Sequence, residues 1–153
     1  MSSRKSPPEI DPRYACFDLR VSNSGIHRFG VYAGQSIPAN RKVIEYAGEK
    51  INRKETKIRL GRRLNYIFTL DNYWCIDGAS GGSGAEFINH SCEPNLTTRV
   101  MRGHILYYSN RRIRKGEELL VDYHYPADVL IVRCKCGAKK CRGTINHAKK
   151  SKR

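Results

Sequence analysis

Short apolar runs separated by glycine and polar residues constrain this chain most strongly. Few of them are longer than six residues, and short runs bounded by turn residues are typical of β-strands rather than helices. The sequence predicts strands at residues 17–22, 30–33, 42–46, 66–70, 73–77, 104–109 and 118–123. We find no internal repeat in the sequence. The pattern therefore predicts a mainly β, non-barrel fold made of several small sheets.

Only residues 52–64 have the pattern of a long helix. Asn52 can serve as its N-cap, and Glu55 three positions later completes a capping box. The exposed face of this helix would be strongly basic, through Arg53, Lys54, Lys57, Arg62 and Arg63. The glycine-rich residues 78–84 should hold no regular structure. Residues 86–90 are expected to form a helical turn that Pro94 terminates.

The chain has 153 residues with a formal net charge of +15, and 39% of its residues are hydrophobic. This length fits one domain, and this composition excludes wholesale disorder. No apolar run approaches the roughly 20 residues that span a bilayer, and the N-terminus lacks the apolar stretch of a secretory signal. We expect an intracellular protein without a membrane partner, in the cytoplasm or nucleoid of a bacterium or in the nucleus otherwise.

Positive charge is concentrated in two segments, residues 41–63 and 133–153, each with nine Lys or Arg. Such charge attracts polyanions, so non-specific contact with DNA is one expectation and plain solubility is the other. The proline-containing residues 1–13 are expected to form a disordered leader. Residues 147–153 read as a flexible basic tail.

Three of the six cysteines, Cys134, Cys136 and Cys141, form a C-x-C-x4-C cluster. Closely spaced thiolates suit one structural Zn²⁺, which takes four ligands in a tetrahedron. Cys92 is the best candidate for the fourth ligand, because it follows a polar turn instead of lying in a strand. Disulfides and unrelated free thiols are the alternatives. The lack of a secretory signal disfavours disulfides.

Several motifs occur in a fixed order: E-Y-A-G-E at 45–49, Y-I-F at 66–68, F-I-N-H-S-C-E-P-N at 87–95 and E-L-L-V-D-Y at 118–123. Together with the cysteine cluster they resemble a SET domain, the protein-lysine methyltransferase module, with a post-SET zinc motif. The chain is similar to minimal free-standing forms from bacteria and viruses. The resemblance implies a SET-type fold with a knot-like C-terminal threading. It implies a SET domain at 14–126 and a zinc-binding post-SET segment at 130–146.

The resemblance also implies transfer of a methyl group from S-adenosylmethionine to a lysine of a protein substrate, such as a histone or a histone-like, DNA-associated protein. Tyr123 and Tyr66 would be the catalytic residues, and Cys92 would complete the zinc ligands. The cofactor-binding residues would be Arg28, Phe29, Tyr66, Asn89, His90, Tyr123 and Arg142. The alternative is a zinc-stabilised, basic nucleic-acid-binding module without methyltransferase activity.

Three features bear on the substrate. Glu86 stands where the family usually has Arg, and Val121 stands where it usually has Phe or Tyr. A side chain as small as valine leaves more room around the lysine ammonium, which favours di- or trimethylation. A cationic substrate would be repelled by a charge of +15. We therefore expect either a DNA-bound substrate or a local acidic groove made by Asp71, Asp77 and Glu86.

Overall fold

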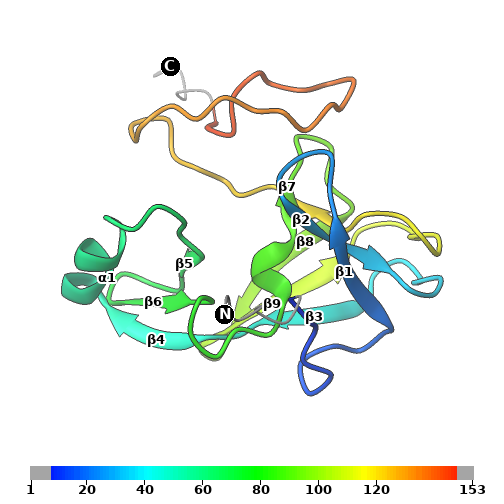
Figure 1. Ribbon diagram of the computed structural model, residues 1–153, viewed down its shortest axis with the longest axis horizontal. Helices are drawn as coiled ribbons and strands as arrows, with labels where there is room; N and C mark the ends of the chain where they lie inside the picture. Colours follow the sequence, from blue (N-terminus) through cyan, green and yellow to red (C-terminus); the bar gives the residue numbers. More distant parts are fainter. Residues whose placement is uncertain (1–7, 148–153) are drawn as a thin grey trace, which may run out of the picture.

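The computed structural model describes residues 8–147, and short strands dominate it (Figure 1). The strands are β1 (Leu19–Asn23), β2 (Phe29–Ala33), β3 (Lys42–Tyr46), β4 (Glu49–Asn52), β5 (Ile67–Thr69), β6 (Trp74–Asp77), β7 (Asn89–His90), β8 (Leu96–Met101), β9 (His104–Ser109) and β10 (Leu120–Val121). The helical elements are α1 (Arg53–Arg59) and the 3-10 turn η1 (Ala85–Phe87). The prediction of a mainly β fold with several small sheets is confirmed.

The strands form three separate sheets. β1 pairs with β2, β6 lies between β4 and β5, and the largest sheet has the order β3-β9-β8-β10-β7. Figure 1 shows the β4-β6-β5 sheet and α1 together on one side of the molecule, with the other two sheets on the opposite side. The residues that follow β10 cross above both sides.

The largest sheet contains the knot-like threading that the motifs predicted. β7 and β8 are consecutive in the chain, yet β10 lies between them and runs parallel to both. Leu120 and Val121 pair with Asn89 and His90, and Val121 also pairs with Leu96. A late strand is thus inserted between two earlier strands that are joined by residues 91–95. Two motifs that are about 30 residues apart in the sequence become neighbours in this way.

In the described part of the chain, one hydrophobic core joins the two right-hand sheets of Figure 1 and also includes Ile76 of β6. Val31 of β2, Ile44 of β3, Leu96 of β8 and Val121 of β10 are all at most 2% exposed and belong to it. Burying an aliphatic side chain of this size contributes about 1.5–3 kcal/mol. The core therefore fixes the position of β10, the strand that leads into Tyr123.

The observed elements differ from the predicted ones mainly in length. Residues 42–46 and 104–109 form strands with the predicted bounds, and the other five predicted strands overlap observed ones. β4, β7 and β8 were not predicted, because their polar side chains hide the alternation that marks a strand. β7 corrects the expected helical turn at 86–90: η1 ends at Phe87 and the chain then becomes extended.

The helix is half as long as predicted. Asn52 is its N-cap as expected, with its side-chain oxygen accepting from the backbone N–H of Glu55 at 2.9 Å. The helix ends at Arg59 instead of residue 64. Gly61 follows the C-cap Leu60, and glycine is a poor helix former. The residues between 61 and 66 are consequently free to approach the loop before β2.

The predicted disordered leader at 1–13 is wrong for its second half. The backbone N–H of Asp11 donates to the Ser83 carbonyl at 2.9 Å, and Ile10 packs against the core. Residues 1–7 lie outside the described part of the chain, as do residues 148–153 of the expected basic tail. Among residues 8–147, no helix is long and apolar enough to cross a membrane.

Candidate active site and metal centre

Asn95 ties the two threaded segments together. Its side-chain N–H donates to the Glu118 carbonyl at 2.9 Å, while its side-chain oxygen accepts from the backbone N–H of Leu120 at 2.8 Å. The residue is 1% exposed. A buried amide that pairs with one backbone carbonyl and one backbone N–H fixes the position of that segment more precisely than apolar packing does. The last residue of the N-H-S-C-E-P-N run is therefore structural.

A buried network holds Asn89 against the start of β2. Its side-chain N–H groups donate to the Phe29 carbonyl at 2.8 Å and to Glu118 Oε1 at 2.9 Å. Ser24 also donates to Glu118 Oε1, at 2.7 Å. A Cβ on residue 30 would overlap that oxygen, which explains Gly30. The sequence analysis missed Glu118, although it is the first residue of the E-L-L-V-D-Y motif.

Hydrogen bonds hold Tyr123 in place through both its side chain and its backbone. Its hydroxyl donates to the Ile88 carbonyl at 2.7 Å, and its backbone N–H donates to His90 Nδ1 at 3.1 Å. Burial raises the pKa of Tyr123 well above its usual value of 10, and the neighbouring phenols of Tyr125 and Tyr66 raise it further. Tyr123 is therefore a neutral hydrogen-bonding group at physiological pH, with no capacity to act as a base.

Aromatic rings surround this phenol. His90 contacts Tyr123 edge-on with centroids 5.3 Å apart, and Tyr125 lies 5.8 Å from it. Tyr66 packs edge-on against Phe87 at 5.6 Å. Such walls exclude water and can stabilise a cationic ammonium by cation–π contact. Tyr123 thus lies among His90 and Tyr125, while Tyr66 packs on Phe87, the residue before Ile88, whose carbonyl accepts from the Tyr123 hydroxyl.

A cavity of about 480 Å³ lies between the loop before β2 and the residues after α1, lined by His27, Arg28, Arg63 and Leu64. Small-molecule sites commonly occupy about 300–1,000 Å³. The guanidinium of Arg28 also lies over the ring of Phe29, 5.7 Å from its centroid. Two arginines suit an anionic group such as a carboxylate. Arg63 and Leu64 were not predicted, because the sequence analysis assigned them to the helix.

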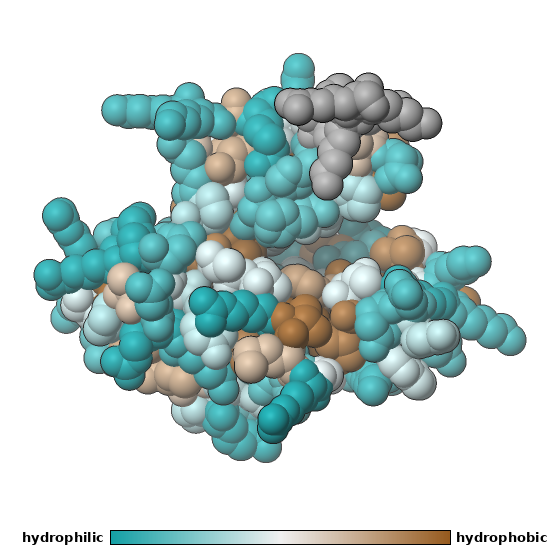
Figure 2. Space-filling view, turned by 180° about the vertical axis from the view of Figure 1, so that it is seen from behind, coloured by the Kyte–Doolittle hydropathy of each residue, from teal (hydrophilic) through white to brown (hydrophobic). Residues whose placement is uncertain are grey.

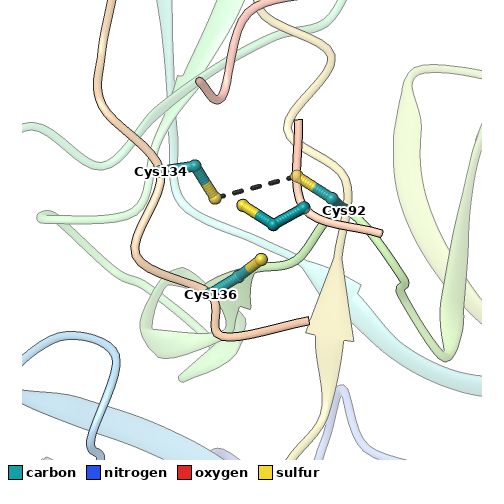
Figure 3. A group of neighbouring side chains, drawn as sticks. Cys92, Cys134 and Cys136 are labelled. Carbon is teal, nitrogen blue, oxygen red and sulfur yellow. Dashed lines mark hydrogen bonds between the residues drawn. The ribbon is translucent and has the colours of Figure 1, made fainter. Parts of the chain in front are cut away.

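The four cysteines expected to bind zinc lie together. Figure 3 labels three of them, Cys92, Cys134 and Cys136. All their sulfur atoms are within 4.8 Å of one another, and the Sγ atoms of Cys92 and Cys134 are 3.7 Å apart. Zn–S bonds of about 2.3 Å in a tetrahedron place sulfurs about 3.8 Å apart. The cluster therefore fits a structural zinc ion. All six cysteines lie within residues 8–147 and are free, so the disulfide alternative is not observed.

Arg142 fastens the post-SET segment to the end of β10. Its guanidinium donates to both carboxylate oxygens of Asp122, at 2.8 and 3.2 Å, and to the Ile145 carbonyl at 2.8 Å. Burial opposes the charge on Asp122, but hydrogen bonds from Arg142 and from the His124 backbone outweigh it and lower the pKa of Asp122 to about 2. The guanidinium expected to close over a cofactor is thus engaged with this carboxylate.

The expected acidic groove does not form. The carboxylate of Asp77 is fully buried and pairs with Arg59 at 2.9 Å and Arg62 at 3.0 Å. Asp71 accepts from two backbone N–H groups of its own turn. Glu86 is partly buried and accepts from the Gly84 N–H at 2.8 Å, and burial raises its pKa. These carboxylates stabilise loops and do not offer a joint anionic surface.

Figure 2 shows a groove between the C-terminal part of the chain and the main body, with hydrophobic side chains at its base. The surface on either side of it is mostly hydrophilic. The C-terminal part of the chain, which the Arg142–Asp122 pair holds to the main body, lies above this groove in the view of Figure 2.

Comparison with known proteins agrees with this geometry. The SET domain family model matches residues 28–124. The chain is 37% identical over 138 residues to histone-lysine N-methyltransferase set-2 of Caenorhabditis elegans. It is 39% identical over 138 residues to the H3 lysine-4 specific histone-lysine N-methyltransferase of Schizosaccharomyces pombe. Each match covers 84% of this chain but only 9% and 15% of the two relatives, so the chain spans less than a sixth of their length.

Solved structures show the same fold. A crystal structure of KRYPTONITE in complex with mCHG DNA and SAH matches with a TM-score of 0.73 and 32% identity, over 86% of this chain and 29% of that one. A second KRYPTONITE structure, with mCHH DNA, an H3(1-15) peptide and SAH, matches with a TM-score of 0.73 and 31% identity, over 86% of this chain and 30% of that one. The resemblance seen in the motifs is confirmed: the chain belongs to the SET domain family.

Proposed function

We propose that the protein is an S-adenosylmethionine-dependent protein-lysine N-methyltransferase. The observation that carries the proposal is the insertion of β10 between β7 and β8, which brings Tyr123 into hydrogen-bond contact with His90 and Ile88. The aromatic walls suit a lysine side chain, and the cavity at Arg28 suits the carboxylate group of a small cofactor. The names of the curated relatives point to the same reaction.

The donor's carboxylate, ammonium and adenosine groups need different partners. The cavity at Arg28 and Arg63 suits the carboxylate, and the rings of Phe29 and Tyr66 provide apolar surface. The side chain of Asn89 is already bound by the Phe29 carbonyl and Glu118. Asn89 would therefore meet the donor mainly through its backbone, as would His90, whose Nδ1 accepts from Tyr123. The role of Arg142 in cofactor binding remains a prediction.

S-adenosylmethionine would supply the methyl group, and its sulfonium charge would favour the neutral form of a nearby lysine amine. The protein's own residues then need only to align the amine and exclude water. Tyr123 would orient the reacting groups as a neutral phenol, because its pKa is raised. Tyr66 and Tyr125 would line the path of the lysine stem. The amine proton would leave to solvent, since Tyr123 cannot accept it.

We propose that Val121 permits more than one methyl transfer. It is 2% exposed and pairs with both His90 and Leu96, two residues before Tyr123. Replacing it by Phe would add volume close to Tyr123. Mass spectrometry of the product should then show a shift toward monomethyl-lysine. An unchanged ratio of mono-, di- and trimethyl-lysine in Val121→Phe would refute this role.

We further propose a histone or another DNA-associated protein as the substrate, reached in a chromosomal setting. The relatives are named histone-lysine methyltransferases, and one similar structure contains DNA together with an H3 peptide. The chain has a net charge of +15, and Asp71, Asp77 and Glu86 form no joint acidic surface, so it would repel a free cationic tail. DNA bound to the tail would offset this repulsion. Basic residues such as Arg53 and Lys54 would contact the DNA.

The test is methyl transfer from labelled S-adenosylmethionine to histones, nucleosomes and other DNA-packaging and ribosomal proteins. We expect the unmodified protein to label lysine. With Tyr123→Phe we expect turnover to be at least a hundredfold lower, the usual effect of removing one positioned hydrogen-bond donor. Tyr73→Phe is the matched control, because Tyr73 is 74% exposed. Undiminished turnover in Tyr123→Phe would assign the role to another residue.

The second candidate, a nucleic-acid-binding module, rests on the charge of the chain. It predicts DNA affinity that falls steeply with salt, with a log–log slope set by the number of phosphates contacted. It also predicts no label on any lysine. Salt-dependent DNA binding together with lysine labelling would mean that both activities belong to one protein. DNA binding without labelling would favour this second candidate.

A further inference from the structure

A second cluster of metal-ligand side chains lies beside the cysteines and shares no residue with them. It consists of Asp122, His124 and His147, whose ligand atoms all lie within 4.8 Å of one another. His124 Nδ1 is 3.0 Å from His147 Nε2, and that same Nε2 is 3.3 Å from Asp122 Oδ2. The two imidazole rings are stacked, with planes inclined by 10° and centroids 5.0 Å apart.

We propose that this triad binds one divalent transition-metal ion in addition to the zinc of the cysteine cluster. Metal bonds of about 2.0–2.2 Å to imidazole nitrogen and carboxylate oxygen place adjacent ligand atoms about 3.0 Å apart in an octahedron and about 3.4 Å apart in a tetrahedron. The observed 3.0 and 3.3 Å lie in this interval. Two imidazoles with one carboxylate favour Zn²⁺, Co²⁺ or Ni²⁺ over Mg²⁺ or Ca²⁺, which prefer oxygen ligands alone.

The chain is shaped to bring these three side chains together. His124 has a left-handed backbone (φ 52°), which residues other than glycine rarely adopt, and its N–H donates to Asp122 Oδ1 at 2.9 Å. This turn lets its imidazole reach His147, 23 residues later. The side chain of His147 is 43% exposed, so an ion can enter from solvent.

Arg142 is the cationic neighbour with which the metal must share Asp122. Its Nη1 donates to Oδ2 at 2.8 Å, and its Nη2 donates to Oδ1 at 3.2 Å and to the Ile145 carbonyl at 2.8 Å. An ion bound through Oδ2 would weaken the first of these contacts and leave the other two. The guanidinium therefore stays in place while one carboxylate oxygen becomes a ligand.

Metal at this triad would link the residue after Tyr123 to the end of the post-SET segment. That junction is otherwise closed by hydrogen bonds, including the backbone N–H of His147 to the Tyr125 carbonyl at 2.9 Å. A bound ion would hold residues 122–125 and 147 as one unit. The ion is a clamp on the loop that carries Tyr123, and it takes no part in methyl transfer.

The experiment uses the full, untagged chain carrying one zinc per protein, after dialysis against a chelator too weak to strip a four-cysteine site. Co²⁺ is then added, and bound zinc and cobalt are counted by elemental analysis while visible absorption reports cobalt coordination. Zinc is retained by the thiolates, which prefer it to cobalt. We expect one zinc and one cobalt per chain. In His147→Ala and His124→Gly we expect one zinc and at least tenfold weaker cobalt binding.

His124→Gly is chosen because glycine adopts the left-handed backbone without strain. His104→Ala is the matched control, since His104 is an exposed histidine outside the triad that pairs with Glu45, and it should keep the second ion. If either variant also loses zinc, proton NMR of the unmodified protein decides: cobalt must shift the imidazole signals of His124 and His147 but not of His104.

Three results would each overturn the proposal: no cobalt bound by the unmodified protein, cobalt binding unchanged in both triad variants, or unshifted imidazole signals of His124 and His147. The measurements are made without methyl donor or protein substrate. Failure here would therefore leave the proposed methyltransferase activity untouched, and failure of that activity would leave the metal site untouched.

Discussion

The hydroxyl of Tyr123 donates a hydrogen bond to the backbone carbonyl of Ile88, across 2.7 Å and 35 residues of sequence. Ile88 directly precedes β7, and Tyr123 follows β10, the strand that pairs with β7. The bond therefore exists only because β10 is threaded beside β7. The position of one phenol depends on the topology of the whole C-terminal half.

The pH dependence of methyl transfer should reflect the pKa of the substrate lysine and not that of Tyr123. Burial raises the pKa of Tyr123 above 10, so this phenol stays protonated throughout the neutral and mildly alkaline range. We expect the single-turnover rate to rise between about pH 7 and pH 9, as more lysine becomes neutral. Replacing the substrate lysine by a less basic amine analogue should move the rising limb to lower pH. A limb that moves with a Tyr123 substitution instead would contradict this account.

Gly30→Ala should lower stability and weaken the binding of S-adenosylmethionine, because it displaces Glu118. A Cβ at residue 30 would overlap Glu118 Oε1, the atom that accepts from both Asn89 and Ser24. Overpacking of this kind costs about 1–3 kcal/mol of unfolding free energy. We expect that loss in urea denaturation, together with weaker binding of S-adenosylmethionine.

Gly25→Ala is the control for this substitution, because nothing lies within 4 Å of a Cβ placed there. It lies in the same loop before β2 and should leave stability and donor binding within experimental error. Equal effects of the two substitutions would mean that the loop, and not the contact with Glu118, determines the outcome.

The buried carboxylate of Asp77 should be essential for stability. It is paired with Arg59 and Arg62, and the Arg59 side chain is itself only 14% exposed. Removing one partner of a buried ion pair costs about 3–5 kcal/mol when the other charge is left without compensation. Arg59 would keep Glu49 and Glu55 as partners. Asp77→Ala should therefore lower the unfolding free energy by less, about 1–3 kcal/mol, the cost of leaving buried hydrogen-bonding groups unpaired. Asp18→Ala, which breaks an exposed pair with Arg20, should cost less than about 1 kcal/mol.

Cys92→Ser should release the post-SET segment. Cys92 is the one cysteine of the cluster that precedes β10, so it joins the cluster to the turn after Asn89 and His90. We expect bound zinc to fall below one per chain and residues 130–147 to become sensitive to protease. Cys16→Ser, an exposed cysteine outside the cluster, should change neither. Full zinc content in Cys92→Ser would remove Cys92 from the ligand set.

The motifs identified the family because they are residue types at fixed spacing, and the cysteine spacing predicted the cluster. The threading was implied by the resemblance to the family. The capping box at Asn52 likewise predicted where the helix begins. The end of that helix was predicted wrongly, since the basic pattern continues past Gly61 while the backbone does not. The local pattern of residues does not show where a segment from a later part of the chain will pack.

Long-range polar contacts account for most of what the sequence analysis missed. Glu118 becomes a structural acceptor only when Ser24 and Asn89, 94 and 29 residues away, reach it. Asp77 and Glu86 look like free surface charges in the sequence, yet arginines and backbone N–H groups bind them. Ile10 is partly buried because a core face formed by distant strands lies beside it.

Calorimetric titration of S-adenosylmethionine into the purified chain tests the central claim most directly, because it asks whether the threaded junction forms a donor site. The account predicts one saturable site per chain, weakened tenfold or more by Arg28→Ala and unaffected by Arg13→Ala, whose exposed guanidinium pairs with Asp11. At a hundredfold excess over its dissociation constant, the donor should stabilise the fold by about 2.7 kcal/mol. No saturable binding and no stabilisation would contradict the account.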